Sequence, residues 1–149
     1  MQKYIFPIFL FLYSAQIFSQ ALPSNSPERK QLVAMGYQFI KQNVTDDGTI
    51  ADNGNIKIVI GKSKDRLVLS TAFERKKLSD RDEFRLLKIA NKINTEANYQ
   101  ISLTEETFIA ALYDYGNYDS KTFAKMIRML EQFDSYLSEN TELVNLLNK

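Results

Sequence analysis

Two runs of acidic and amide side chains are the first candidates for chemistry in this sequence. Asp46-Asp47-Gly48 and Asp52-Asn53-Gly54 place several oxygen ligands close together. Hard cations such as calcium prefer carboxylate and carbonyl oxygens, so a calcium site is one interpretation. However, the spacing does not match an EF-hand loop, and Asp, Asn and Gly are also the usual residues of turns. We therefore predict turns here and assign no metal ligand.

A second acidic group comprises Glu105, Glu106 and Asp114, which could form a general acid–base pair. A catalytic carboxylate usually lies in a pocket that shifts its pKa. The surrounding pattern instead predicts a hairpin tip and a strand end, where side chains meet water. We expect ordinary surface charges and assign no catalytic residue.

The third candidate group is aromatic. Tyr113, Tyr115 and Tyr118 lie close together in the sequence, with Phe123 nearby. Tyrosine is enriched at protein interfaces, so these three residues are the predicted partner-binding site. The alternative is a core edge, where the rings are buried and the hydroxyls reach water.

Missing residue types restrict the possible chemistry further. The 149-residue chain contains no His, Cys or Trp. It therefore lacks the commonest general base and every thiol nucleophile, and zinc sites built from Cys and His are excluded. No phosphate-binding loop, dinucleotide fingerprint, nucleophile elbow or HExxH motif is present. The sequence favours a protein that is not an enzyme and has no cofactor. The alternative is a small hydrolase or metal-dependent enzyme that uses Asp, Glu and Tyr.

Three asparagines need a separate explanation. Asn91, Asn94 and Asn98 recur at helical spacing beside an apolar stripe, although Asn is unfavourable within helices. We interpret them as structural amides that tie the helix to backbone groups of nearby strands or loops. The alternative is that they line a polar site.

The elements that must position these residues follow from periodicity and capping patterns. The pattern Ser26-Pro27-Glu28 predicts the start of a helix. Asn53-Gly54 predicts a hairpin turn. The TFIAALYDY segment is apolar on both faces, which is typical of a central strand. A helix is the alternative for that segment. The expected order is a helix from Pro27 to about Gln42, strands over Thr49–Ala51, Asn55–Ile60 and Leu67–Phe73, a helix after Ser79 with the stripe Phe84, Leu87, Ile89, Ala90, Ile93 and Ala97, strands over Tyr99–Leu103 and Thr107–Tyr115, a helix from about Ser120 to Asn140, and a short terminal helix.

This order predicts one α+β domain, with an antiparallel sheet of about five strands packed with helices in the order α-β-β-β-α-β-β-α. The predicted domain covers residues 27–149 and follows a short linker, residues 22–26. Gly36 lies within the first predicted helix, where we expect a close contact between helix and sheet.

Residues 1–21 have the pattern of a secretory signal peptide. Lys3 precedes an apolar run, Ile5–Tyr13, that is too short to span a membrane, and small residues follow it. Cleavage is expected after Ala21, or alternatively after Ser19, and an uncleaved anchor is the other interpretation. The expected location is periplasmic or secreted, with no membrane span after cleavage.

The charge balance argues against nucleic acid as a partner. The chain has 19 basic and 18 acidic residues, and Lys3 is the only charged residue of the predicted signal peptide. Cleavage would therefore leave 18 of each sign. A neutral domain lacks the basic excess typical of proteins that bind nucleic acid.

As a whole, the chain resembles the YbjN family, whose fold is shared with type III secretion chaperones. Besides the element order, the resemblance rests on MGY at Met35–Tyr37, RLVLSTAF at Arg66–Phe73, and IANKINTEANYQISLTEETFIAALYDY at Ile89–Tyr115. It covers about Pro27 to Leu137. In that family a helix with Asn at three-residue spacing precedes the fourth strand, and Asn91 and Asn94 match this pattern. The resemblance implies a bacterial protein-binding, chaperone-like or regulatory module that binds a protein or peptide on its sheet face or edge. A homodimer is also an arrangement that it implies.

Overall fold

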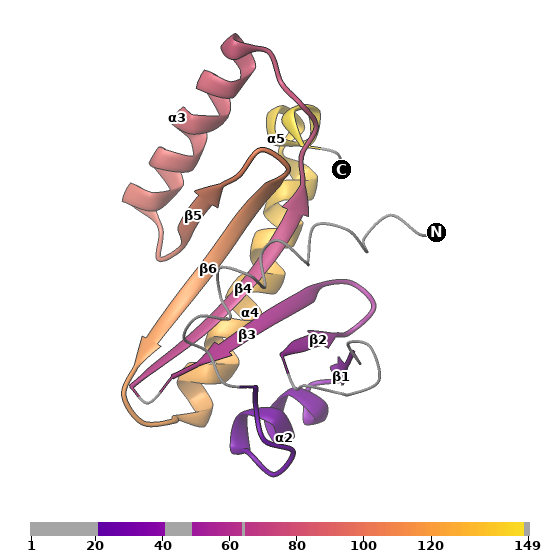
Figure 1. Ribbon diagram of the computed structural model, residues 1–149, viewed down its shortest axis with the longest axis vertical. Helices are drawn as coiled ribbons and strands as arrows, with labels where there is room; N and C mark the ends of the chain where they lie inside the picture. The colour runs from indigo at the N-terminus through magenta and orange to yellow at the C-terminus, as the bar shows by residue number, and fades with distance from the viewer. Residues whose placement is uncertain (1–20, 41–48, 64, 148–149) are drawn as a thin grey trace.

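The computed structural model describes residues 21–40, 49–63 and 65–147 (Figure 1). The helices are α2 (Pro27–Ala34), α3 (Asp80–Glu96), α4 (Ser120–Glu139) and α5 (Thr141–Leu146). The strands are β1 (Gln38–Phe39), β2 (Ile50–Asp52), β3 (Lys57–Lys62), β4 (Arg66–Glu74), β5 (Gln100–Leu103) and β6 (Thr107–Tyr115). They form one antiparallel sheet in the order β1-β2-β3-β4-β6-β5. The predicted α+β class is confirmed, and β1 is a sixth strand that we did not predict.

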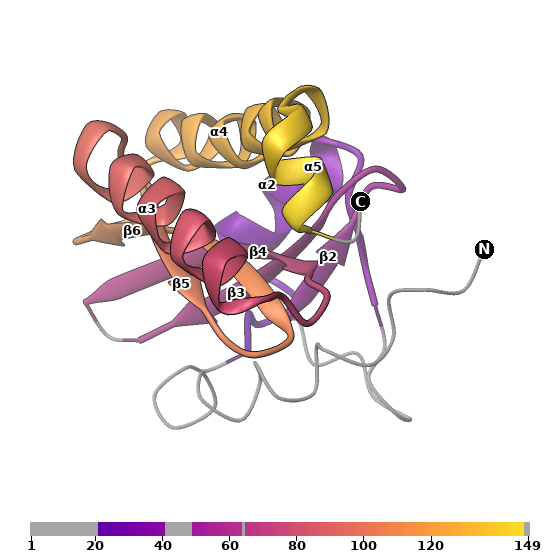
Figure 2. The same ribbon diagram turned by 90° about the horizontal axis from the view of Figure 1, so that it is seen from above.

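The helices pack on one face of the sheet (Figure 2). One core cluster joins α2 and the first half of α4 to β3, with Leu32, Ile58 and Leu130 at its centre. A second cluster joins α3, α5 and the second half of α4 to β5 and β6, with Leu86, Phe108 and Phe133 among its members. Removal of this apolar surface from water supplies the main stabilisation of the fold.

The centre of the sheet is the pairing of β4 with β6, whose register runs from Arg66 opposite Tyr115 to Glu74 opposite Thr107. Strand β6 lies between β4 and β5 and is buried on both faces over most of its length. Phe108, Ala110 and Leu112 face the helices, so the alternation of a strand places Ile109 and Ala111 on the opposite face. The prediction of a central strand for this segment is confirmed.

The first helix is shorter than predicted. It ends at Ala34 rather than near Gln42, and Gly36 has a φ of +91°, in the left-handed region that favours glycine. The backbone N–H of Tyr37 donates to the Leu32 carbonyl, which turns the chain out of the helix and into β1. The predicted helix-to-sheet contact at Gly36 is also wrong, because a Cβ there would meet open space.

The apolar stripe of α3 was only partly predicted. Leu86, Ala90 and Ile93 are buried against the sheet, as is expected for one helix face. Phe84 is 59% exposed and Leu87 is 43% exposed, in contrast to the prediction. The two side chains project from another side of α3, because they lie about 100° or more around the helix from Leu86.

The residues before α2 belong to the folded structure. Leu22 is only 2% exposed and joins the core cluster of α2, and the Ser26 hydroxyl accepts a 3.2 Å hydrogen bond from the Arg29 N–H. That bond is a helix N-cap, as the Ser-Pro-Glu pattern predicts. None of the helices in the described part of the chain is long and apolar enough to cross a membrane.

Candidate protein-binding surface

Two of the three predicted tyrosines share the sheet face that is turned away from the helices. Because Leu112 faces the helices, Tyr113 and Tyr115 project from the opposite face at the end of β6. Tyr113 is 39% exposed and Tyr115 is 70% exposed. These are large apolar rings in contact with water, at the end of a strand that is otherwise buried.

Strand β4 supplies the neighbours of these tyrosines. In the register, Val68 lies opposite Tyr113 and Arg66 lies opposite Tyr115. The guanidinium carbon of Arg66 is 5.9 Å from the centroid of the Tyr113 ring, a cation–π geometry. We call these four residues, Arg66, Val68, Tyr113 and Tyr115, the open-face patch.

The open-face patch contains residue types that are common at protein interfaces. Tyrosine and arginine are the residue types, with tryptophan, that most often carry the energy of protein interfaces. Within the described residues, no carboxylate forms an ion pair with Arg66. Its N–H donors could therefore bind a carboxylate of a partner, and the Tyr113 ring lies within cation–π range of the guanidinium.

Tyr118 lies in a different place from the other two tyrosines. It is partly buried beside the core cluster of α2, and its ring centroid is 5.8 Å from that of Phe123. The hydroxyl donates to the side-chain oxygen of Gln31. Burial raises the pKa of the Tyr118 hydroxyl, and the negative charges of Glu28 and Asp119 raise it further. The structure thus joins Tyr118 to the α2–α4 contact and not to the open-face patch.

The three asparagines also differ from one another. The amide of Asn94 donates to the Ile101 carbonyl at 3.2 Å and accepts from the Ile101 N–H at 2.5 Å, which ties α3 to β5. All three asparagines are exposed. Only Asn94 bonds to a strand, because Asn91 and Asn98 make no such bond within the described residues.

The candidate carboxylates do not form a reactive centre in the structure. Glu105 and Glu106 are exposed between β5 and β6, whereas Asp114 is partly buried near the end of β6. The part of the chain that the structure describes has no group of three or more acidic side chains that could hold a metal ion. Asp46 and Asp47 lie outside the described residues.

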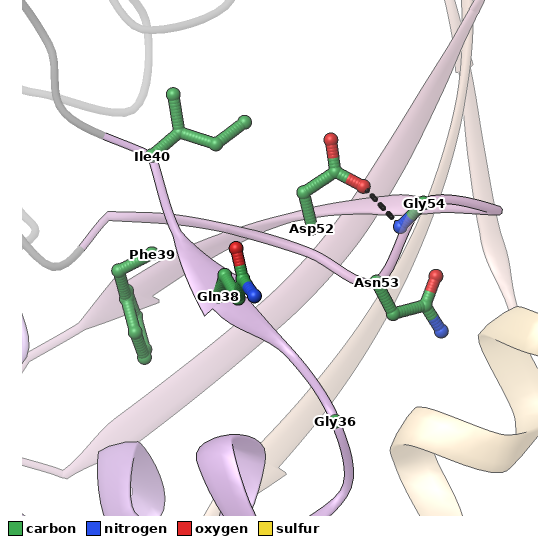
Figure 3. A pocket seen from close by; sticks show the side chains of 7 residues that line it. All are labelled: Gly36, Gln38, Phe39, Ile40, Asp52, Asn53 and Gly54. Carbon is green, nitrogen blue, oxygen red and sulfur yellow. Dashed lines mark hydrogen bonds between the residues drawn. The ribbon is translucent and has the colours of Figure 1, made fainter.

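One hollow lies beside β1 and the β2–β3 turn (Figure 3). It has a volume of about 410 Å³ and is lined by Gly36, Gln38, Phe39, Ile40, Asp52, Asn53 and Gly54. Asp52 is the only ionisable side chain among these residues, and its carboxylate accepts a 2.7 Å hydrogen bond from the Gly54 N–H. This bond is the turn role that we predicted for the Asp-Asn-Gly run, and a single carboxylate offers no acid–base pair.

Two buried polar contacts were not predicted from the sequence. Glu28 is buried and pairs with the ammonium of Lys62, while its second oxygen has no partner among the described residues. The side chain of Arg75 is 6% exposed and pairs with Glu83 at 2.5 Å. Neither pair has a sequence pattern, because the partners come from separate elements. Both act as structural links between a helix and a strand end.

Comparisons with known proteins support the fold. No family model matches the chain, and no curated protein matches it in sequence. A solved structure has a similar fold: "Crystal structure of YbjN, a putative transcription regulator from E. coli". The chain has a YbjN-like fold. The similarity has a TM-score of 0.59 and covers 87% of this chain and 98% of that one, at 13% sequence identity. At this identity the likeness concerns the fold alone, and the fold-level part of the predicted resemblance is confirmed.

Proposed function

We propose that this chain is a non-enzymatic protein-binding module, regulatory or chaperone-like, and that it binds a protein or peptide through the open-face patch. The observation that carries the proposal is the pairing of exposed Tyr113 and Tyr115 with Arg66 across two central strands. The pairing of β4 with β6 fixes the backbone beneath these side chains, so a partner does not have to order the backbone on binding.

The fold comparison is consistent with this proposal. The solved YbjN structure, which has a similar fold, is described as that of "a putative transcription regulator". Balanced charge favours a protein partner over nucleic acid, because phosphate binding needs a basic excess. A homodimer belongs to the same proposal, since a self-complementary patch would bind a second copy.

We further propose that the protein acts in the periplasm or outside the cell. The support is the signal-peptide pattern of residues 1–21, which ends immediately before Leu22. Cleavage after Ala21 would keep Leu22, which packs in the core, within the mature chain. Fractionation of the host, with detection of the chain in the envelope or the medium, tests this location.

The experiment that tests the function is a cross-linking pull-down in the host. Tagged full-length chain, its Arg66→Ala/Tyr115→Ala variant and a control would be cross-linked, and captured proteins identified by mass spectrometry. Tyr136→Ala is the matched control, because Tyr136 is also an exposed tyrosine but lies on α4. We expect one stoichiometric partner that the patch variant loses and the control retains. A partner held equally by all three proteins, or no partner at all, would contradict the proposal.

A further inference from the structure

The sheet face that is turned away from the helices is apolar at its centre. Val59, Ser70 and Ala111 are register partners there across β3, β4 and β6, and Ile109 lies two residues before Ala111 on the same face. We call these four residues the open-face centre. Three of them are apolar and none is charged, whereas the water-facing side of an antiparallel sheet normally carries polar side chains.

The open-face centre is buried, although the described helices all lie on the other side of the sheet (Figure 2). The exposed fraction of its side chains is between 2% and 7%. None of the four residues belongs to the two core clusters that the helices cover. Val59 packs with Ile50 and Ile40, but these are neighbours within the sheet, since Ile50 is its register partner and the Ile40 N–H donates to the Ile50 carbonyl. The described helices therefore do not account for this burial.

The cover over the open-face centre is narrow. Ser102 of β5 is the register partner of Ile109 and shares its face, yet the Ser102 side chain is exposed. Tyr115, at the end of β6 on the same face, is 70% exposed. A single segment of chain, and not a further layer of helices, would cover β3, β4 and β6 while leaving these two positions in water.

Composition indicates which segment this is. The described residues leave out residues 1–20, 41–48, 64 and 148–149. Residues 41–48, KQNVTDDG, contain Val44 as their one hydrophobic residue, and the two shorter parts contain only Lys and Asn. Residues 1–20, in contrast, contain the uncharged apolar run Ile5–Tyr13. Because burial of apolar surface is what favours such a contact, Ile5–Tyr13 is the segment that fits the open-face centre.

The chain between this run and the folded residues is long enough to reach the open face. Leu22 packs in the core cluster of α2, on the helix side of the sheet. Residues 14–21 span up to about 26 Å when extended. Layers that pack face to face are separated by only about 10 Å. Residues 14–21 can therefore pass an edge of the sheet and bring the run over its other face.

We propose that Ile5–Tyr13 lies on the open-face centre in the uncleaved chain and buries it. The open-face patch adjoins this segment, since Ala111 precedes Tyr113 by two residues on the same face. Cleavage after Ala21 would remove the segment and join the uncovered centre to the patch as one larger apolar surface for a partner. That consequence rests on the proposed function, whereas the docking of Ile5–Tyr13 concerns the uncleaved chain alone.

The first test measures how fast a thiol at the open-face centre is labelled. The chain has no cysteine, so Ser70→Cys introduces a single thiol with little change in side-chain size. Uncleaved full-length chain would be made by cell-free synthesis without membranes and treated with a maleimide. Adding Ile8→Asp/Leu10→Asp would bury two carboxylates with the segment, so we expect the segment to detach and labelling to become at least about tenfold faster. An unchanged rate would overturn the proposal.

Two controls show where the effect arises. Gln2→Asp/Gln16→Asp adds the same charge to residues 1–20 but outside the apolar run, so it should leave the labelling of Ser70→Cys unchanged. Thr71 is the next residue of β4, faces the helices and is 2% exposed. A thiol at Thr71→Cys should therefore stay protected in every variant. Equal acceleration of Ser70→Cys by both pairs of charges would contradict a specific role of Ile5–Tyr13.

Disulfide formation tests the contact without added charges. Each of residues 5–13 would be replaced by Cys in turn, together with Ser70→Cys, and the dilute uncleaved chain oxidised. We expect an intramolecular disulfide from at least one position. Ser135→Cys is the matched control, because Ser135 is exposed on α4 on the other side of the sheet, and it should form none. No disulfide with Ser70→Cys, or equal yields with Ser135→Cys, would overturn the proposal. Neither test involves a partner, so a failure here is distinguishable from a failure of the pull-down.

Discussion

The hydroxyl of Tyr37 donates a 2.9 Å hydrogen bond to the carboxylate of Glu131, which joins the turn after α2 to the middle of α4. Tyr37 is almost fully buried, and Asn53 from the β2–β3 turn donates to the same carboxylate oxygen at 3.4 Å. Three segments that are distant in the sequence thus meet at one carboxylate, beside the core cluster that contains α2.

Replacement of Tyr37 by Phe should weaken this junction while the ring packing remains. A hydrogen bond to a charged group contributes about 1.5–3 kcal/mol, so we expect the free energy of unfolding to fall by about that amount. Urea denaturation followed by circular dichroism measures the change. Tyr115→Phe is the control, because its hydroxyl is on the surface, and it should leave the midpoint unchanged. Equal midpoints for both variants would contradict the role of Tyr37.

The stability of the protein should fall at alkaline pH, and Tyr37 should contribute to that fall. Burial, followed by the hydrogen bond to Glu131, raises the pKa of Tyr37 above its usual value of 10.0. Above about pH 10 the unfolded tyrosine loses its proton while the folded one keeps it, so the folded state binds more protons and loses stability as pH rises. In Tyr37→Phe the free energy of unfolding should fall less steeply with pH, by up to about 1.4 kcal/mol per pH unit. Urea unfolding between about pH 9 and about pH 11 measures this dependence. An unchanged slope would contradict this assignment.

The Glu28–Lys62 pair should show the asymmetry of a buried charge. Lys62→Met leaves the buried Glu28 carboxylate without its cation. Breaking a fully buried pair lowers the free energy of unfolding by about 3–5 kcal/mol. Because Lys62 is partly exposed, we expect a loss of about 1–3 kcal/mol here. Glu28→Gln/Lys62→Met should recover part of that loss. Lys92→Met is the matched control, since its pair with Glu96 is exposed and should change stability by less than about 0.5 kcal/mol. Thermal and urea unfolding of the unchanged chain, Lys62→Met, Glu28→Gln and the double variant measure the cycle, and additive effects of the two single changes would argue against the pair.

The open-face patch should matter for binding but not for folding. Tyr115→Ala removes an exposed ring at a strand end, so we expect the free energy of unfolding to change by less than about 0.5 kcal/mol. Leu130→Ala, in contrast, empties a fully buried position and should cost about 2–5 kcal/mol. Urea unfolding compares the two variants. A large loss of stability in Tyr115→Ala would assign that ring to the core edge, the alternative that the sequence leaves open.

Local patterns were sufficient for most of the fold. The TFIAALYDY segment is apolar at successive positions, which favours a strand covered on both faces over the alternative of a helix, and β6 is that strand. The caps at Ser26 and Ser79 are also local, because a side-chain oxygen bonds an N–H three residues ahead. The end of α2 was mispredicted because Tyr37, Phe39 and Ile40 continue an apolar pattern that the left-handed Gly36 interrupts.

By itself, the sequence determined most of the elements, the central position of β6 and the absence of His and Cys chemistry, because these depend on residue types and near neighbours. Only the tertiary structure decided which side chains meet. The β4–β6 register brings Arg66 to Tyr113 and Tyr115, and the chain turn after α3 brings Asn94 to Ile101. The same packing separates Tyr118 from its sequence neighbours and leaves Phe84 and Leu87 in water. Such contacts depend on how whole elements are placed on the sheet, and the periodicity of a single element does not contain that placement.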